Sequence, residues 1–315
     1  MQEKILSAVM GHCVGDSLGV PVEFLSREEL KQDPVKDMRG HGTYNQPEGT
    51  WSDDTSMTLC TLDSLSNGLD YKDIMDKFLA WYINSEYTPF GETYDIGRCT
   101  SKAIYRYDGG EDPLYCGGAD ERENGNGSLM RILPVLFHLQ KTYGENWTEK
   151  KESYKIIHNI SAITHAHKRS MTACGIYLTI ADYISKDYNL KEAVELGIEK
   201  SFNYYSRKEG FKEELKYYER IKDKDFYKLP EEEIESTGYV VHSMEASIWS
   251  LLNTESYKDC VLKAVNLGED TDTTAAIAGG LAGLHYGYES IPEEWLKKIQ
   301  KREFVEGICK KYSTI

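Results

Sequence analysis

The chain has 315 residues, of which 40% are hydrophobic and 28% charged, enough to fill the core of one large domain. Its formal net charge of −15 argues against nucleic acid or an anionic membrane as the main partner. Seven scattered cysteines without a CxxC pair indicate reduced thiols in a cytoplasmic protein, and neither a signal peptide nor an uninterrupted apolar run of 18 residues is evident.

Apolar residues recur at three- and four-residue spacing along most of the chain, which predicts helices. In chain order the predicted helices are 3–19, 55–67, 70–84, 129–143, 151–164, 170–186, 189–202, 240–253, 256–267, 273–286 and 292–300. Strand patterns with period-two alternation are nearly absent. We therefore predict an all-α fold, a single-domain orthogonal helical globule over residues 1–315. Within it, the Lys-, Glu- and Tyr-rich stretch 206–235 is expected to form a solvated helical hairpin or excursion.

Two helix starts, far apart in the sequence, each carry two carboxylates beside hydroxyl residues. The first reads WSDDTS and the second GEDTDTT, and together they offer Ser52, Asp53, Asp54, Asp270, Asp272 and Thr273. Ordinary helix capping accounts for one acid at each start and is the simpler interpretation. Adjacent carboxylates repel each other unless a cation lies between them, and neither cluster contains Lys or Arg. Oxygen-only ligands suit Mg²⁺, Mn²⁺ or Ca²⁺, and four carboxylates fit two such ions better than one if both helix starts face one central cleft.

Five weaker patterns could contribute to a ligand site. Glu23 follows Pro21 and so lies outside the first helix, beyond Asp16. A Gly/Asn-rich turn leads into a helix expected to begin at Ser128, where free backbone N–H groups would suit a phosphate. The others are an Asp before a Gly turn, a histidine pair in a helix break and an aromatic residue at a helix entrance, namely Asp95, His165, His167 and Tyr239.

In this order the patterns resemble the ADP-ribosylglycohydrolase family. The blocks that carry the resemblance are GDSLGVPVEF, SDDTSM, YDIG, GNGSLMR, TH, GYVVHSMEASIW and GEDTDTTAAIAGGLAGLHYG, and they cover nearly the whole chain. The resemblance implies an all-α enzyme with two divalent metal ions, Mg²⁺ or Mn²⁺, that hydrolyses the C1″ glycosidic bond between ADP-ribose and a modified side chain. The substrate would be an ADP-ribosylated protein, with an arginine linkage favoured, or a small ADP-ribose conjugate.

The resemblance also implies roles for individual residues. Glu23 and Asp53 are the candidates for proton transfer, and the sequence does not choose between them. The metal ligands would be Ser52, Asp53, Asp54, Asp270, Asp272 and Thr273. The substrate contacts would be Asp95 and Gly97 at the terminal ribose, Asn126, Gly127 and Ser128 at the pyrophosphate, His165, and Tyr239 at the adenine.

Two alternatives belong to other functional classes. A non-catalytic ADP-ribose-binding or structural protein of the same fold would have lost some of the six metal ligands, yet all six are present. A terpene-synthase-like pyrophosphate lyase would require a third acid one turn after its Asp pair, where this chain has Met57.

Overall fold

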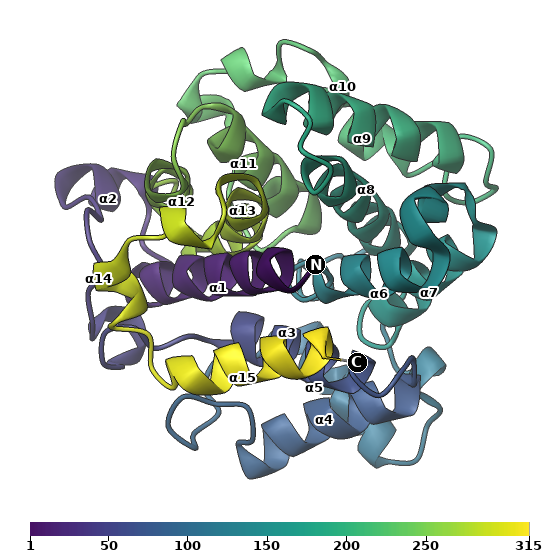
Figure 1. The fold of residues 1–315 in the computed structure, drawn as a ribbon, viewed down its shortest axis with the longest axis horizontal. Coiled ribbons are helices and arrows are strands. Elements are labelled where there is room, and N and C mark those ends of the chain that lie inside the picture. Colours follow the sequence, from purple (N-terminus) through teal and green to yellow (C-terminus); the bar gives the residue numbers. More distant parts are fainter. Residues whose placement is uncertain (315) are drawn as a thin grey trace.

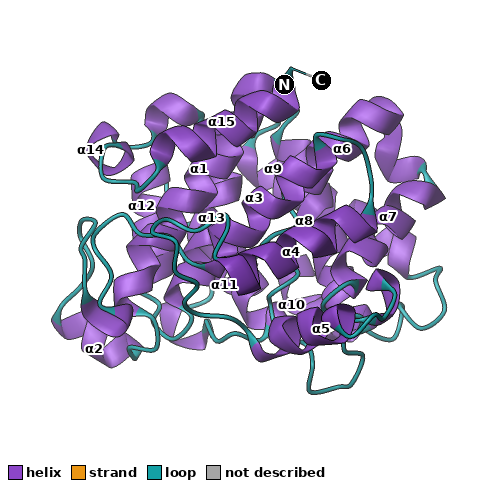
Figure 2. Ribbon diagram, turned by 90° about the horizontal axis from the view of Figure 1, so that it is seen from below, coloured by secondary structure: helices purple, strands orange, loops and turns teal. Residues whose placement is uncertain are grey.

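The computed structural model describes residues 1–314 and shows an all-α protein, as predicted. Over these residues Figure 2 shows only helices and loops, with three isolated bridges in place of any sheet. The α-helices are α1 (Gln2–Gly19), α2 (Arg27–Gln32), α3 (Asp53–Leu65), α4 (Tyr71–Asn84), α5 (Arg98–Asp108), α6 (Pro134–Tyr143), α7 (Lys151–Ala162), α8 (Lys168–Ile184), α9 (Leu190–Tyr205), α10 (Glu219–Lys222), α11 (Val240–Leu252), α12 (Tyr257–Val265), α13 (Thr271–Tyr286), α14 (Glu293–Leu296) and α15 (Arg302–Ser313).

Helices α1 and α13, from opposite ends of the chain, form the centre of the fold (Figure 1). Their contact is made by small residues that allow the two backbones to touch. A Cβ atom added at Gly15 would lie 2.1 Å from the Ala275 carbonyl oxygen, and one at Gly11 would lie 2.4 Å from the Gly279 carbonyl oxygen. The GHCVGDSLG repeat of glycines every four residues therefore encodes a close helix pair.

Helix α1 is buried nearly all round because other helices cover it on every side. Its length and apolarity alone would suffice to cross a membrane, but 94% of the qualifying window lies buried inside the fold. Below it in Figure 1 lie α15 and α3, and α12 and α13 lie above it. A helix that is apolar on all faces is expected at the core of a large helical domain.

The helix predictions were correct for the long elements and wrong at several ends. The predicted helix 129–143 begins only at Pro134, because residues 127–133 form turns before the proline at the first helical position. The predicted helix 292–300 is reduced to α14. Helices α2, α5 and α15 were not predicted, whereas α10 lies in the stretch 206–235, where a helical hairpin was one of the two expectations. In α5 only Thr100, Ala103 and Ile104 are buried, so its sequence is polar on average although it is amphipathic.

The stretch 206–235 is anchored to the domain, contrary to the predicted solvated excursion. It contains α10 and short 3₁₀ turns, and it buries Leu215, Tyr218, Ile221, Phe226 and Ile234. Its charged residues occupy the outer face, which is why composition alone suggested full solvation. The segment packs against α9 and α11, so its apolar residues join the one described hydrophobic core.

Candidate active site

The first acidic cluster is the start of α3, and a buried carboxylate of α1 fixes its shape. Ser52 is the N-cap residue, and its Oγ accepts a hydrogen bond from the Asp54 backbone N–H at 3.3 Å. The Asp16 carboxylate accepts hydrogen bonds from the backbone N–H groups of Ser52 and Thr55, each at 3.0 Å, and from the Thr55 hydroxyl at 2.6 Å. Asp16 therefore satisfies donors that helix capping would otherwise use, which frees Asp53 and Asp54 for another role.

The second acidic cluster is the start of α13, held beside Glu23 by a pair of backbone hydrogen bonds. The Phe24 N–H donates to the Glu269 carbonyl at 2.7 Å, and the Glu269 N–H donates to the Leu25 carbonyl at 2.8 Å. Phe24 and Glu269 both adopt the left-handed backbone region, with φ of 67° and 61°. Residues other than glycine rarely adopt this backbone conformation, and such backbone strain concentrates at functional sites. These hydrogen bonds between the two loop segments place Glu23 next to Asp270 in space.

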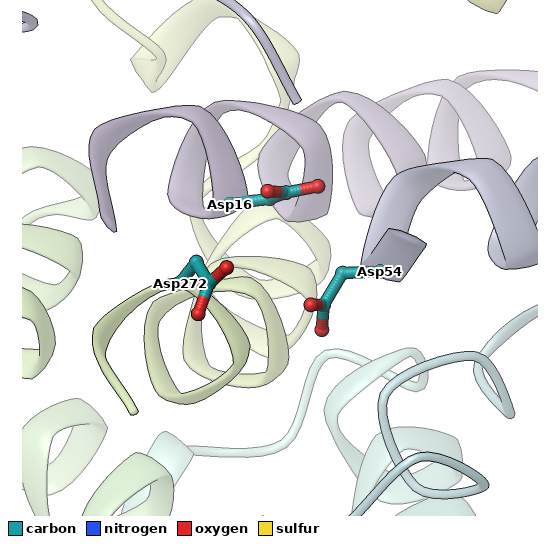
Figure 3. A group of neighbouring side chains, drawn as sticks. All are labelled: Asp16, Asp54 and Asp272. Carbon is teal, nitrogen blue, oxygen red and sulfur yellow. The ribbon is translucent and has the colours of Figure 1, made fainter. Parts of the chain in front are cut away.

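The acids of the two helix starts meet at one place, and Figure 3 shows two of them, Asp54 and Asp272, together with Asp16 of α1. One oxygen each of Asp16, Asp54 and Asp272 lies within 4.8 Å of the others, and the same holds for Glu23, Asp95 and Asp272. Asp272 is common to both groups, so the two form one continuous cluster. The Thr273 hydroxyl donates to the Asp54 carboxylate at 3.2 Å and joins the two helix starts directly.

The cluster lacks the positive charge that its carboxylates require. One oxygen each of Glu23, Asp54, Asp270 and Asp272 is buried without a hydrogen-bond partner, and no Lys or Arg within residues 1–314 pairs with these acids. Burial, together with the neighbouring Asp95 and Asp270, raises the pKa of Glu23 to about 9. Burial, and next the charge of Asp95, raise the pKa of Asp53 well above the usual range. Burial, and next the charge of Glu23, do the same for the pKa of Asp272. Oxygen-only donors with unused lone pairs fit a divalent cation.

The predicted pyrophosphate loop lies beside this cluster. Asn126 donates from Nδ2 to the Asp270 carboxylate at 2.7 Å and to the Ser243 hydroxyl at 2.8 Å. Its N–H donates to the Gly238 carbonyl at 3.1 Å, so the loop pairs with the entrance of α11. Gly97 is exposed at the start of α5, and Asp95 just before it is partly buried with a left-handed φ of 50°.

Gly127 and His165 are in contact, whereas the Ser128 side chain points elsewhere. A Cβ atom at Gly127 would lie 2.8 Å from His165 Cε1, so only glycine leaves this edge of the imidazole open. The Ser128 hydroxyl is fully buried, accepts from Ser161 at 2.9 Å and faces Cys174. The Ser128 hydroxyl therefore faces the core, and the predicted ligand contact, which concerns the backbone N–H group of Ser128, stays a prediction.

Tyr239 stands at the entrance of α11 against a buried arginine. Arg169 donates from Nη1 to the Tyr239 hydroxyl at 3.1 Å, and its guanidinium carbon lies 3.4 Å from the ring centre of Tyr217. Glu214 accepts from Arg169 Nε at 2.8 Å, and Glu121 pairs with Nη1 at 2.7 Å. Two of these partners come from the stretch 206–235, so this segment forms the wall behind Tyr239.

The whole chain matches one family of proteins. A family model described as ADP-ribosylglycohydrolase matches residues 1–314. The chain belongs to the ADP-ribosylglycohydrolase family. It is a hydrolase, and its all-α fold agrees with a solved structure of an ADP-ribosylglycohydrolase-related protein complex. That structure is 29% identical, covers 99% of this chain and 98% of its own, and superposes with a TM-score of 0.79.

Two relatives of this glycohydrolase have activities that are named. ADP-ribosylarginine hydrolase Tri1 of Serratia proteamaculans (strain 568) is 30% identical over 309 residues, which is 98% of this chain and 78% of the relative. ADP-ribosyl-[dinitrogen reductase] glycohydrolase of Rhodospirillum rubrum is 29% identical over 313 residues, covering 96% of this chain and 92% of the relative.

Sequence reasoning missed two residues of the glycohydrolase site. Asp16 was noted at the end of the first helix without a role, and its spacing to the Asp53 pair carries no signal because the two lie on different helices. Arg131 closes the GNGSLMR block and is completely buried. A charged residue in an otherwise apolar stretch was the available signal, since arginine is rarely buried without a reason.

Proposed function

We propose that this glycohydrolase removes ADP-ribose from modified arginine side chains by cleaving the C1″ glycosidic bond, with two divalent cations, Mg²⁺ or Mn²⁺, in the acidic cluster. The observation that carries the proposal is the set of buried carboxylate oxygens without partners on three separate elements. Six oxygen-donor residues would hold the cations, namely Ser52, Asp53, Asp54, Asp270, Asp272 and Thr273.

The bound cations would supply the positive charge that grips the vicinal ribose hydroxyls and lowers the pKa of a water molecule. The protein side chains do the rest. Asp95 and Gly97 border the terminal ribose, and the backbone around Asn126 and Gly127 receives the pyrophosphate. The carboxylates around C1″ stabilise the oxocarbenium-like transition state, in which positive charge develops on the sugar ring.

Proton transfer is assigned to Glu23 or Asp53, with Glu23 favoured. Glu23 follows a 3₁₀ turn and has a free Oε2, whereas Asp53 is held within the first turn of α3. Its raised pKa keeps the Glu23 carboxyl protonated at neutral pH in the absence of cations. With the cations bound by the other acids, the Glu23 carboxyl would donate its proton to the departing side chain, and its carboxylate would then act as a base toward water.

The arginine linkage is supported by the two relatives with named activities, of which one hydrolyses ADP-ribosylarginine. The test is release of ADP-ribose from an arginine-ADP-ribosylated protein and, in parallel, a serine-ADP-ribosylated one, each with Mg²⁺, Mn²⁺ or EDTA. We expect metal-dependent release from the arginine substrate alone. Release from the serine substrate alone would refute the linkage, and undiminished release in EDTA would refute the role of the cations.

We expect the wall formed by stretch 206–235 to control affinity for the adenine end of ADP-ribose. Glu214→Gln weakens the ion pair that holds Arg169, and so loosens Tyr239. The expected result is a several-fold higher KM with kcat unchanged, because a buried charge-assisted hydrogen bond is lost far from the scissile bond. Glu213→Gln is the matched control, since Glu213 is exposed and its ion-pair partner is Lys212. Equal kinetics for the two variants would contradict this role.

A further inference from the structure

A buried arginine without a carboxylate partner lies behind the pyrophosphate loop. The Arg131 guanidinium has no exposed surface, and its Nε and Nη1 atoms have no hydrogen-bond partner. Its Nη2 donates to the Ile160 carbonyl at 3.1 Å and to the Thr164 hydroxyl oxygen at 2.6 Å, and Cζ lies 4.8 Å from the Phe78 ring centre. Burial lowers the pKa of Arg131 only to about 10, so the positive charge persists at neutral pH.

The contact to Thr164 continues to the histidine that borders the loop. Thr164 Oγ1 lies 2.9 Å from His165 Nδ1. An arginine can only donate, so the Thr164 oxygen accepts from Arg131 and its own proton needs an acceptor. Thr164 is fully buried, and among residues 1–314 its hydroxyl has one neighbour able to accept, His165 Nδ1. The Thr164 proton therefore points to Nδ1, which leaves the ring proton on Nε2.

Both Cε1 and Nε2 of His165 face the loop, and of these two atoms only Nε2 can carry an N–H proton. Cβ atoms placed at Gly127 and Gly125 would lie 3.3 Å and 3.5 Å from Nε2. Burial, and next the charge of Arg131, lower the pKa of His165 to about 3, so the ring is neutral at physiological pH. A neutral ring has only one N–H group, and its position determines whether the imidazole attracts or repels an anion.

We propose that Arg131 and Thr164 are positioning residues that hold His165 as the tautomer with its proton on Nε2, which makes this N–H a donor to the pyrophosphate bound beside Gly127. The inference rests on the proposed function for the identity of the ligand. The contacts run from the Arg131 guanidinium through the Thr164 hydroxyl to the His165 ring, and they act on the histidine whether or not a ligand is bound. The tautomer of His165 and its contribution to ligand affinity can therefore be measured separately.

The first measurement is ¹⁵N NMR of the histidine rings in the full-length, metal-free protein, with His165 assigned by comparison with His165→Gln. We expect a protonated Nε2 and an unprotonated, hydrogen-bonded Nδ1 in the wild type. Thr164→Val, which keeps the side-chain shape, should move the Nδ1 resonance to that of an acceptor without a hydrogen bond. Thr164→Ser is the matched control and should restore the wild-type resonance.

The second measurement is the affinity for ADP-ribose of the same variants. We expect Thr164→Val to raise Kd about tenfold and leave kcat unchanged, while Thr164→Ser binds as the wild type does. A proton on Nδ1 in the wild type, or a Thr164→Val protein with unchanged resonances and affinity, would overturn the inference. Failure of the wild type to release ADP-ribose from any substrate would instead refute the proposed function, because the tautomer is read without turnover.

Discussion

Asp53→Asn and Asp272→Asn are each expected to abolish divalent-cation binding and hydrolysis together, with kcat/KM at least about a thousandfold lower. Each change removes one charge from a cluster in which Asp272 belongs to both groups of converging carboxylates. Calorimetric titration with Mn²⁺, with turnover measured on the same preparation, tests this. Asp70→Asn is the control, because it removes one charge at the exposed start of α4 while keeping an effective N-cap residue.

The same two variants should be more stable than the wild type when no cation is present. A carboxyl group with a raised pKa holds a proton in the folded protein that the unfolded chain has already released, so the free energy of unfolding falls as pH rises. The Glu23 pKa of about 9 extends this fall from neutral pH to about 9. The pKa of buried His12 is lowered to about 4, so this residue makes the free energy of unfolding rise with pH, but only below about pH 6.5.

Thermal unfolding in EDTA between pH 7 and pH 9 measures this dependence. The wild type should lose stability across the range, the two variants should lose less, and Mn²⁺ should flatten the wild-type profile. Variants that are less stable than the wild type in EDTA would show that the acids stabilise the fold on their own, and would contradict a cation site.

Gly15→Ala is expected to destabilise the protein by about 3 kcal/mol and to lower cation affinity with it. The new methyl carbon would lie 2.1 Å from the Ala275 carbonyl oxygen and 2.6 Å from the Ala275 carbonyl carbon, both backbone atoms that cannot rotate away. Helices α1 and α13 must then separate, and this displaces Asp16 from the start of α3. Denaturant unfolding and Mn²⁺ titration of the variant test both effects.

Gly307→Ala on α15 is the matched control for this substitution. Gly307 is exposed within a helix, and a Cβ atom there would have no neighbour within 4 Å. Alanine is the better helix former, so this variant should be more stable by about 0.5–1 kcal/mol. Equal stability of the Gly15→Ala protein and the wild type would mean that the helix pair is not packed as closely as described.

The sequence predicted the helical class and the long helices because their apolar faces repeat with the period of a helix. The polar average composition of α5 hid its amphipathic pattern, because this helix buries only three residues, and the bounds of α10 were hidden within the charged stretch 206–235. Composition predicted exposure for this stretch, yet Tyr218 and Phe226 bury their rings in the core. A single sequence reports the average polarity of a segment, whereas burial depends on which few side chains turn inward.

The acidic cluster was predictable because both of its halves stand in short, unusual motifs. Its geometry was not, since no spacing along the chain relates Asp16 to Thr55 or Arg131 to Thr164. Ser128 shows the same limit: the GNGS motif predicted free backbone N–H groups for a ligand, but it did not predict that the Ser128 hydroxyl faces Cys174. Side-chain direction in an irregular loop follows from tertiary contacts rather than from residue type.

The central helix pair also determines when the enzyme can form during its synthesis. The Tyr257 hydroxyl donates to the Gly11 carbonyl at 2.6 Å across 246 residues of chain, and α13 follows later still. At about 5–20 residues per second, a ribosome needs roughly 12 to 50 seconds to supply these partners. The central helix α1 is therefore made first, and its partners α12 and α13 are made near the end. A nascent or truncated chain therefore exposes the apolar surface of α1, to which chaperones can bind. It carries the acids at the start of α3 but lacks those at the start of α13 until the last helices emerge.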